Sequence, residues 1–109
     1  YGILGGNRTR LHQRIHESLA DLAAFMRPTL TVIDGFRILL RNGPGGGNPA
    51  DTALEQTVAA GTDPVALDAW AARTWWRMEP DQLVFLGLAA QRGLGTPHFE
   101  RLDVKTIDL

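Results

Sequence analysis

The sequence predicts an α/β domain in which helices pack on a mixed β-sheet. Segments with apolar residues at helical spacing alternate along the chain with short segments rich in β-branched residues. The chain has 109 residues, of which 44% are hydrophobic and 21% are charged. This length and balance are typical of a single globular domain, residues 1–109, that buries one core. The expected order of elements is (β)-α-β-β-α-α-β.

Residues 1–6 are expected to form the end of a strand and a glycine turn, and the first helix follows them. Asn7 or Thr9 would cap this helix, because their side-chain oxygens accept from free backbone N–H groups. Pro28 would end it and favour an extended conformation at Arg27. The helix carries one apolar stripe, made of Leu11, Ile15, Leu19, Leu22 and Met26.

A β-branched run at residues 29–34 predicts a buried strand, followed by a turn that starts at Asp34. Residues 36–40 fit either a helical turn or more strand. Residues 42–48 must form a loop, because four of the seven are glycine and one is proline. Residues 55–60 are predicted as the next strand.

The second half of the chain has clear signals for two helices. Asp63 and Pro64 are typical of a helix start, with aspartate as the cap and proline at the first position. This helix is expected to reach Trp76, and another to begin at Pro80. Alternating apolar and charged residues predict a last strand at residues 101–105. The expected core is Leu11, Ile15, Leu22, Val32, Ile33, Val65, Ala69, Leu86 and Val104.

Composition excludes several classes of function. The formal net charge is −1, so the chain lacks the basic field that nonspecific nucleic-acid binding needs. No apolar run approaches the roughly 18 residues of a membrane span. Because the segment has no cysteine, it can hold no disulfide, thiolate zinc site or iron–sulfur cluster of its own.

Three arginines crowd the start of the first expected helix. Cations are unfavourable at that end of the helix dipole, and Arg10 and Arg14 form a like-charge pair one turn apart. An anion bound by Arg8, by these two arginines and by the backbone near Asn7 would remove both penalties. The alternative is that Arg14 pairs with Glu17 and that the other arginines are solvated.

His12 and His16 are four residues apart on the same expected helix. Paired histidine ligands of zinc sites have this spacing, so the pair could bind a divalent metal. A third ligand would come from Asp34, Asp63 or Asp68, or from a part of the protein outside this segment. The alternative is two amphipathic histidines beside the apolar stripe.

A further candidate site lies at the strand ends, where open α/β sheets bind their ligands. The candidates are Asp34, Asp63 and Asp68, as acid–base or metal-binding groups, and Asn42, Gly43 and Gly45, in a loop whose backbone a ligand could approach closely. The alternatives are structural: a helix cap for Asp63, a turn residue for Asp34, and for Asp68 a side chain that faces solvent or pairs with an arginine.

Three tryptophans lie on one expected helix, and adjacent helical side chains point in different directions. We therefore expect Trp70, Trp75 and Trp76 not to share one core layer. At least one is expected to lie at a surface. The tryptophans would either pack under the next helix or form an interface with another chain.

Several motifs, taken in their order and spacing, resemble one family. They are GGNR at residues 5–8, IDG at 33–35, NGP at 42–44, TDPVALDA at 62–69 and RGLG at 92–95. Together they resemble the C-terminal half of the domain of unknown function 362. The resemblance implies that the chain is the C-terminal fragment of a larger protein, with the missing N-terminal half as its partner.

The resemblance implies a setting rather than a reaction. Many family members resemble redox-associated bacterial proteins with iron–sulfur clusters, which here would lie outside this cysteine-free segment. The leading hypothesis is thus an anion- or metal-dependent ligand site in a redox-associated protein, with the cofactor unknown. The alternative is a non-enzymatic domain that docks an electron-transfer partner.

The location and the assembly follow from the same hypothesis. A cytoplasmic location is the default, and the family resemblance adds export by the twin-arginine route as an alternative. A half-domain would leave apolar surface uncovered. We therefore expect a homo-oligomer, formed through the tryptophan region or an unpaired strand edge.

Overall fold

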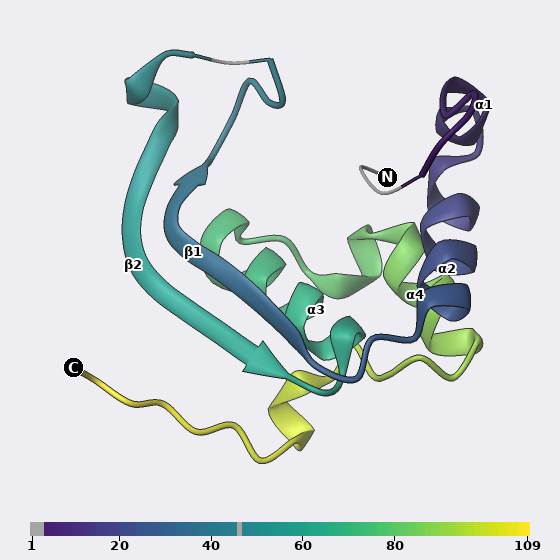
Figure 1. Cartoon of the computed structure of the whole chain (residues 1–109). Coiled ribbons are helices and arrows are strands. Elements are labelled where there is room, and N and C mark those ends of the chain that lie inside the picture. The colour runs from purple at the N-terminus through teal and green to yellow at the C-terminus, as the bar shows by residue number, and fades with distance from the viewer. Residues whose placement is uncertain (1–3, 46) are drawn as a thin grey trace.

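The computed structural model describes residues 4–45 and 47–109. These residues form helices and one β-hairpin (Figure 1), so the α/β class is confirmed, although the sheet is antiparallel rather than mixed. The elements are α1 (Thr9–His12), α2 (Ile15–Met26), β1 (Thr31–Leu39), β2 (Thr52–Gly61), α3 (Pro64–Trp76) and α4 (Val84–Gln91). Short 3-10 turns lie at Pro49–Asp51, Pro80–Gln82 and Phe99–Arg101. None of the helices in the described ranges is long and apolar enough to cross a membrane.

The hairpin is longer than the sequence predicts. β1 pairs with β2 from Thr31 opposite Gly61 to Leu39 opposite Thr52. The predicted turn at Asp34 is wrong, because β1 continues through it and includes most of the segment that was ambiguous. A β-bulge between Gly35 and Arg37 shifts the register of the strand pairing there.

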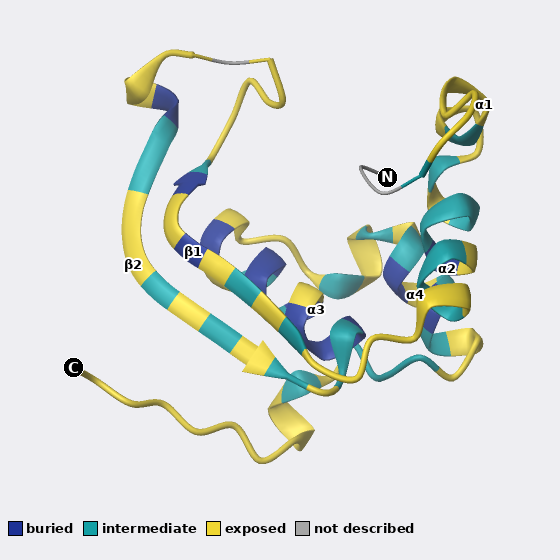
Figure 2. Ribbon diagram, viewed as in Figure 1, coloured by how far each residue is buried: buried dark blue, intermediate teal, exposed yellow. Residues whose placement is uncertain are grey.

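Helix α3 covers one face of the hairpin. Ile38 of β1 is buried with Ala71 and Trp75 of α3, and Figure 2 shows buried residues gathered where these elements meet. Trp70 packs edge-on against Trp75, with ring centroids 5.2 Å apart. Trp76 is exposed and its Nε1 donates to the Leu39 carbonyl at 3.1 Å, so the three tryptophans are divided as expected.

A second buried cluster joins the three longer helices. Leu86 of α4 is its largest fully buried side chain. Ala20 of α2 and Ala69 of α3 pack against it, because small residues let the helices approach closely. Figure 1 shows α2 and α4 side by side. An ion pair on this side joins Arg92 to Asp21, at 2.6 Å.

The predicted core is correct in part. Three of its residues are buried: Val65, Ala69 and Leu86. Four others are half-buried: Leu11, Ile15, Leu22 and Ile33. Val32 and Val104 are exposed, which corrects the prediction. Val32 lies on the hairpin face away from α3. Val104 lies in residues 102–109, which form no strand because no described strand pairs with them.

The N-terminal elements also differ from the prediction. Residues 1–3 of the expected first strand lie outside the described residues, and residues 4–6 form no strand. The single expected helix is divided at Arg14, whose φ of −134° and ψ of 59° are not helical. No residue of α1 is buried, so packing does not hold α1 in line with α2. Arg27 is left-handed (φ 42°), not extended, because it caps the end of α2.

Candidate functional site

The strand-end residues are not gathered into one site. Because β1 and β2 are antiparallel, their carboxyl ends lie at opposite ends of the hairpin (Figure 1). The loop with Asn42, Gly43 and Gly45 follows β1, whereas Asp63 follows β2. A crevice at the strand ends requires those ends to share one edge of the sheet. The described residues therefore do not build the predicted crevice.

Asp63 has a structural role. Its Oδ1 accepts from the Ala66 N–H at 2.8 Å and its Oδ2 from the Thr96 N–H at 2.9 Å. The helix-cap alternative is confirmed, and the second bond also joins the start of α3 to the segment after α4. Gly95 packs so closely on this carboxylate that a Cβ there would overlap it. Both carboxylate oxygens are thus used within the fold.

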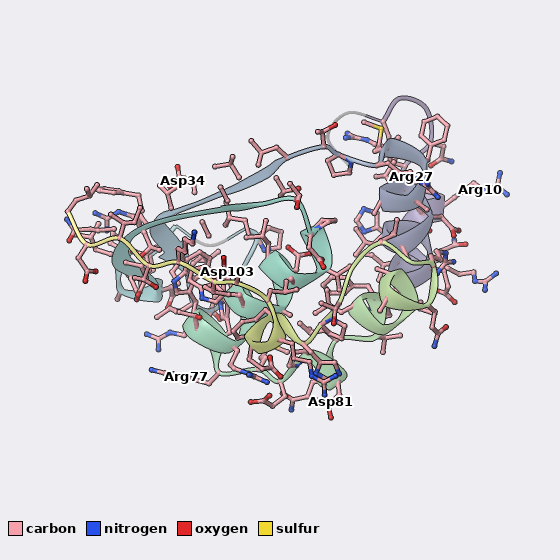
Figure 3. The ribbon with its side chains drawn as sticks, turned by 90° about the horizontal axis from the view of Figure 1, so that it is seen from below. Arg10, Arg27, Asp34, Arg77, Asp81 and Asp103 are labelled. Carbon is pink, nitrogen blue, oxygen red and sulfur yellow. The ribbon has the colours of Figure 1, made fainter. Side chains whose placement is uncertain are left out.

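Asp34 lies on β1, on the hairpin face turned away from α3 (Figure 3). Its Oδ1 accepts from the Phe36 N–H at 2.9 Å. The carboxylate therefore bonds the local backbone, as the structural alternative expects, but beside a bulge instead of in a turn.

The arginines near α1 are exposed, and Arg14 has an acidic partner. Arg14 pairs with Glu17, Nη2 to Oε1 at 3.2 Å, which confirms the alternative for Arg14. Asn7, Arg8 and Arg10 are exposed, and Arg10 points away from the helices (Figure 3). Helix α1 is a single turn, so it provides little of the dipole on which the argument for anion binding depended. Anion binding here stays a prediction.

The two histidines lie on different helices. His12 ends α1 and His16 follows the start of α2, so the break at Arg14 removes the continuous helix that their spacing assumed. The His16 ring stacks parallel to the Phe85 ring, with centroids 6.4 Å apart. Within residues 4–45 and 47–109, no three His, Asp or Glu side chains are grouped to hold a metal.

A pocket of about 410 Å³ opens between α2, α3 and α4. Leu19, Leu22 and Met26 line it from α2, Val65 from α3, and Phe85 from α4. This lining is apolar and half-buried or buried for the most part. Pockets of this size and character are where small molecules bind in many proteins.

Asp68 is the one charged residue that lines this pocket. It belongs to α3 and is exposed, so its carboxylate lies at the pocket rim. It makes no hydrogen bond or ion pair within the described part of the chain. Burial of one side of the group raises the pKa of its carboxyl above the usual value. A cation bound near the carboxylate would lower this pKa.

Asp51 is 5% exposed and was not predicted from the sequence as a site residue. Its Oδ1 accepts from Arg41 Nε at 2.7 Å and its Oδ2 from Asn42 Nδ2 at 2.9 Å. The bonds from Asn42 and then Arg41 hold the pKa of this carboxyl below its usual value. An arginine at the end of one strand and an aspartate at the start of the next, across a glycine loop, are the signal that could have found it.

The family model of the domain of unknown function DUF362 matches residues 1–73. The chain belongs to this family. The match to DUF362 includes the hairpin, Asp51 and Asp68, and it ends within α3, before α4 and its share of the pocket. Comparison with curated proteins and with solved structures finds no match.

Proposed function

We propose that this DUF362 domain binds a small apolar molecule that carries a cationic group, in the pocket between α2, α3 and α4. The observation that carries the proposal is the lining: one unpartnered carboxylate, Asp68, at the rim of an otherwise apolar pocket. An apolar ligand body would fill the pocket, and an ammonium group at its end would pair with Asp68. Charge complementarity therefore selects a cation over an anion or a neutral molecule.

The physical terms support binding of modest strength. Burial of apolar surface contributes about 25 cal/mol per Å², and the loss of ligand motion offsets part of this. An ion pair at a partly exposed rim adds about 1 kcal/mol. For a small probe such as hexylamine we expect a Kd of about 0.1–1 mM.

The Asp68→Asn variant tests the role of the carboxylate. We expect hexylamine to bind the wild type and to bind Asp68→Asn about fivefold more weakly, because the amide cannot pair with an ammonium. Hexanol should bind weakly and equally to both, and hexanoate should not bind. Titrations followed by amide chemical shifts measure all three.

The matched control is Asp81→Asn, which removes the same charge from an exposed turn (Figure 3) whose residues do not line the pocket. It should bind hexylamine like the wild type. Equal affinity of Asp68→Asn and wild type for hexylamine, or binding of hexanoate at the same site, would overturn the proposal.

The dependence on pH gives the same test a second readout. The charged carboxylate binds the cation, so hexylamine affinity should rise with pH as Asp68 loses its proton. Because burial raises the pKa of Asp68, the rise should occur above the pH at which an ordinary aspartate titrates. The raised pKa also means that the charged form destabilises the fold at neutral pH, so Asp68→Asn should be folded and slightly more stable there.

We propose docking of a second copy of the chain as the other candidate function. The hairpin face away from α3 exposes Val32 (60%), Phe36 (55%) and Val58 (69%), and Figure 2 shows this exposure along both strands. Asp34 and Arg37 lie among them with opposite charges. A two-fold pairing of this face would place each Asp34 near the other copy's Arg37, so the surface is complementary to itself.

Val58→Glu tests this association. We expect the wild type to be a dimer by light scattering, and Val58→Glu to be a monomer, because the new carboxylates would be buried close to each other in the dimer. Val84→Glu, which changes an exposed valine on α4, should stay dimeric. A monomeric wild type at high concentration would contradict the prediction.

The other expectations remain predictions. They are the association with iron–sulfur redox proteins, the N-terminal half as a partner, the compartment and a divalent metal at the histidine pair. The redox association is the setting in which the docking function would bring an electron-transfer partner to the domain.

A further inference from the structure

The loop that follows β1 is held by a buried charge. One oxygen of the Asp51 carboxylate accepts a hydrogen bond from Arg41 Nε, and the other accepts one from Asn42 Nδ2. Arg41 Nη2 also donates to the Ala50 carbonyl at 3.1 Å. Two successive residues at the start of an exposed loop are therefore fixed by one buried group on the other side of the loop.

This arrangement adds little buried apolar surface to the hydrophobic core. The described loop residues from 41 to 50 are all exposed, so no apolar burial offsets the desolvation of the Asp51 carboxylate. Asn42 adopts a left-handed conformation (φ 59°), which asparagine tolerates at a small cost. A functional side chain on a loop needs supporting hydrogen bonds of this kind to keep a fixed geometry.

The fixed loop presents hydrogen-bond donors. The Arg41 side chain is 65% exposed, so part of its guanidinium faces solvent while Nε and Nη2 are engaged. The N–H groups of Gly43, Gly45 and Gly47 donate no hydrogen bond within the described residues. Open space surrounds Gly45 and Gly47, since a Cβ at either would meet nothing within 4 Å.

No acidic side chain lies between residues 41 and 50, so no carboxylate of the loop itself repels an anion there. Backbone N–H groups next to an arginine held by a carboxylate suit an oxyanion. We propose that Arg41 and the amides of Gly43, Gly45 and Gly47 bind an oxyanion, a carboxylate or a phosphate group of a ligand. The site is separate from the pocket at Asp68, so either proposal can fail without the other.

Amide chemical shifts locate the binding directly. Titration with inorganic phosphate or with acetate, at constant ionic strength set by chloride, should shift the amide resonances of Gly43, Gly45 and Gly47. The resonances of Gly87 and Gly93, which lie on and after α4, are the internal reference and should stay in place. The anion with the lower Kd identifies the group that the loop prefers.

Two variants distinguish binding by an oriented Arg41 side chain from nonspecific electrostatic attraction of the anion to positive charge. Arg41→Lys keeps the charge and loses the planar fork, so binding should weaken at least fivefold. Asp51→Asn removes a negative charge near the anion, and general attraction would then increase. We expect binding to weaken at least threefold instead, because Arg41 loses the partner that orients it.

Arg77→Ala is the matched control, since it removes an exposed arginine at the end of α3 (Figure 3) and should bind within twofold of the wild type. Unchanged binding in Arg41→Lys, or tighter binding in a folded Asp51→Asn, would overturn the proposal. So would loss of binding in Arg10→Ala, which would assign the anion to the arginines near α1. If Asp51→Asn does not fold, Arg41→Lys decides the outcome.

Discussion

Replacing Gly35 with alanine is expected to lower the free energy of unfolding by about 2–3 kcal/mol. Gly35 is buried on β1, and a Cβ there would overlap the indole of Trp75 and lie 3.1 Å from the Thr57 carbonyl oxygen. Trp75 is buried against the hairpin, so it cannot move aside without disturbing Ile38 and Ala71. Urea denaturation of both proteins measures the change.

Gly87→Ala is a control with the opposite expected sign. Gly87 is exposed within α4, and a Cβ there would meet nothing within 4 Å. Alanine favours a helix interior over glycine by about 1 kcal/mol, so this variant should be more stable than the wild type. A Gly35→Ala protein as stable as the wild type would show that the close contact with Trp75 does not limit the packing of the hairpin on α3.

The same contact explains why the sequence misplaced the end of β1. Asp34 followed by Gly35 is a common turn signal, and the prediction of a turn depended on that local preference. In the structure Gly35 serves the close approach of an aromatic side chain from α3, which lies 40 residues further along the chain. Local patterns do not contain such tertiary contacts.

Other elements were predictable where the local signal is strong. The start of α3 at Pro64, with Asp63 as its cap, follows from two adjacent residues, and the bounds of β2 contain the expected strand. The strand expected at residues 101–105 has the right alternation but no described strand beside it. Alternation gives the preference of a segment, and pairing depends on what lies next to it.

For the candidate sites, too, the sequence predicted local features but not the contacts made by tertiary packing. Asp68 could be named from the sequence, but its place at a pocket rim depends on α2 and α4, which pack against α3 from distant parts of the chain. Asp51 was missed because its role depends on the register that brings it beside Arg41. Residue type and spacing identified chemical groups, and tertiary packing decided which of them share an environment.

Replacing Leu86 with alanine is expected to lower the free energy of unfolding by about 3 kcal/mol. Leu86 is 1% exposed and packs against Ala20, Val65 and Ala69 in the helical cluster. Truncation removes its apolar contacts and leaves a cavity that the small neighbours fill poorly. Because Leu86 also lines the pocket near Asp68, that cavity would extend the pocket.

The enlarged pocket gives this variant a second expected property. A ligand that binds only the folded state stabilises it by RT ln(1 + [L]/Kd), so hexylamine should raise the Tm of Leu86→Ala more than that of the wild type. Ile38→Ala is the matched control, because Ile38 is buried in the other cluster, between the hairpin and α3. It should be destabilised by a comparable amount and gain no more from hexylamine than the wild type. Equal gains in Leu86→Ala and Ile38→Ala would place the amine outside the pocket between α2, α3 and α4, whereas a larger gain confined to Leu86→Ala would tie ligand binding to the packing of these three helices.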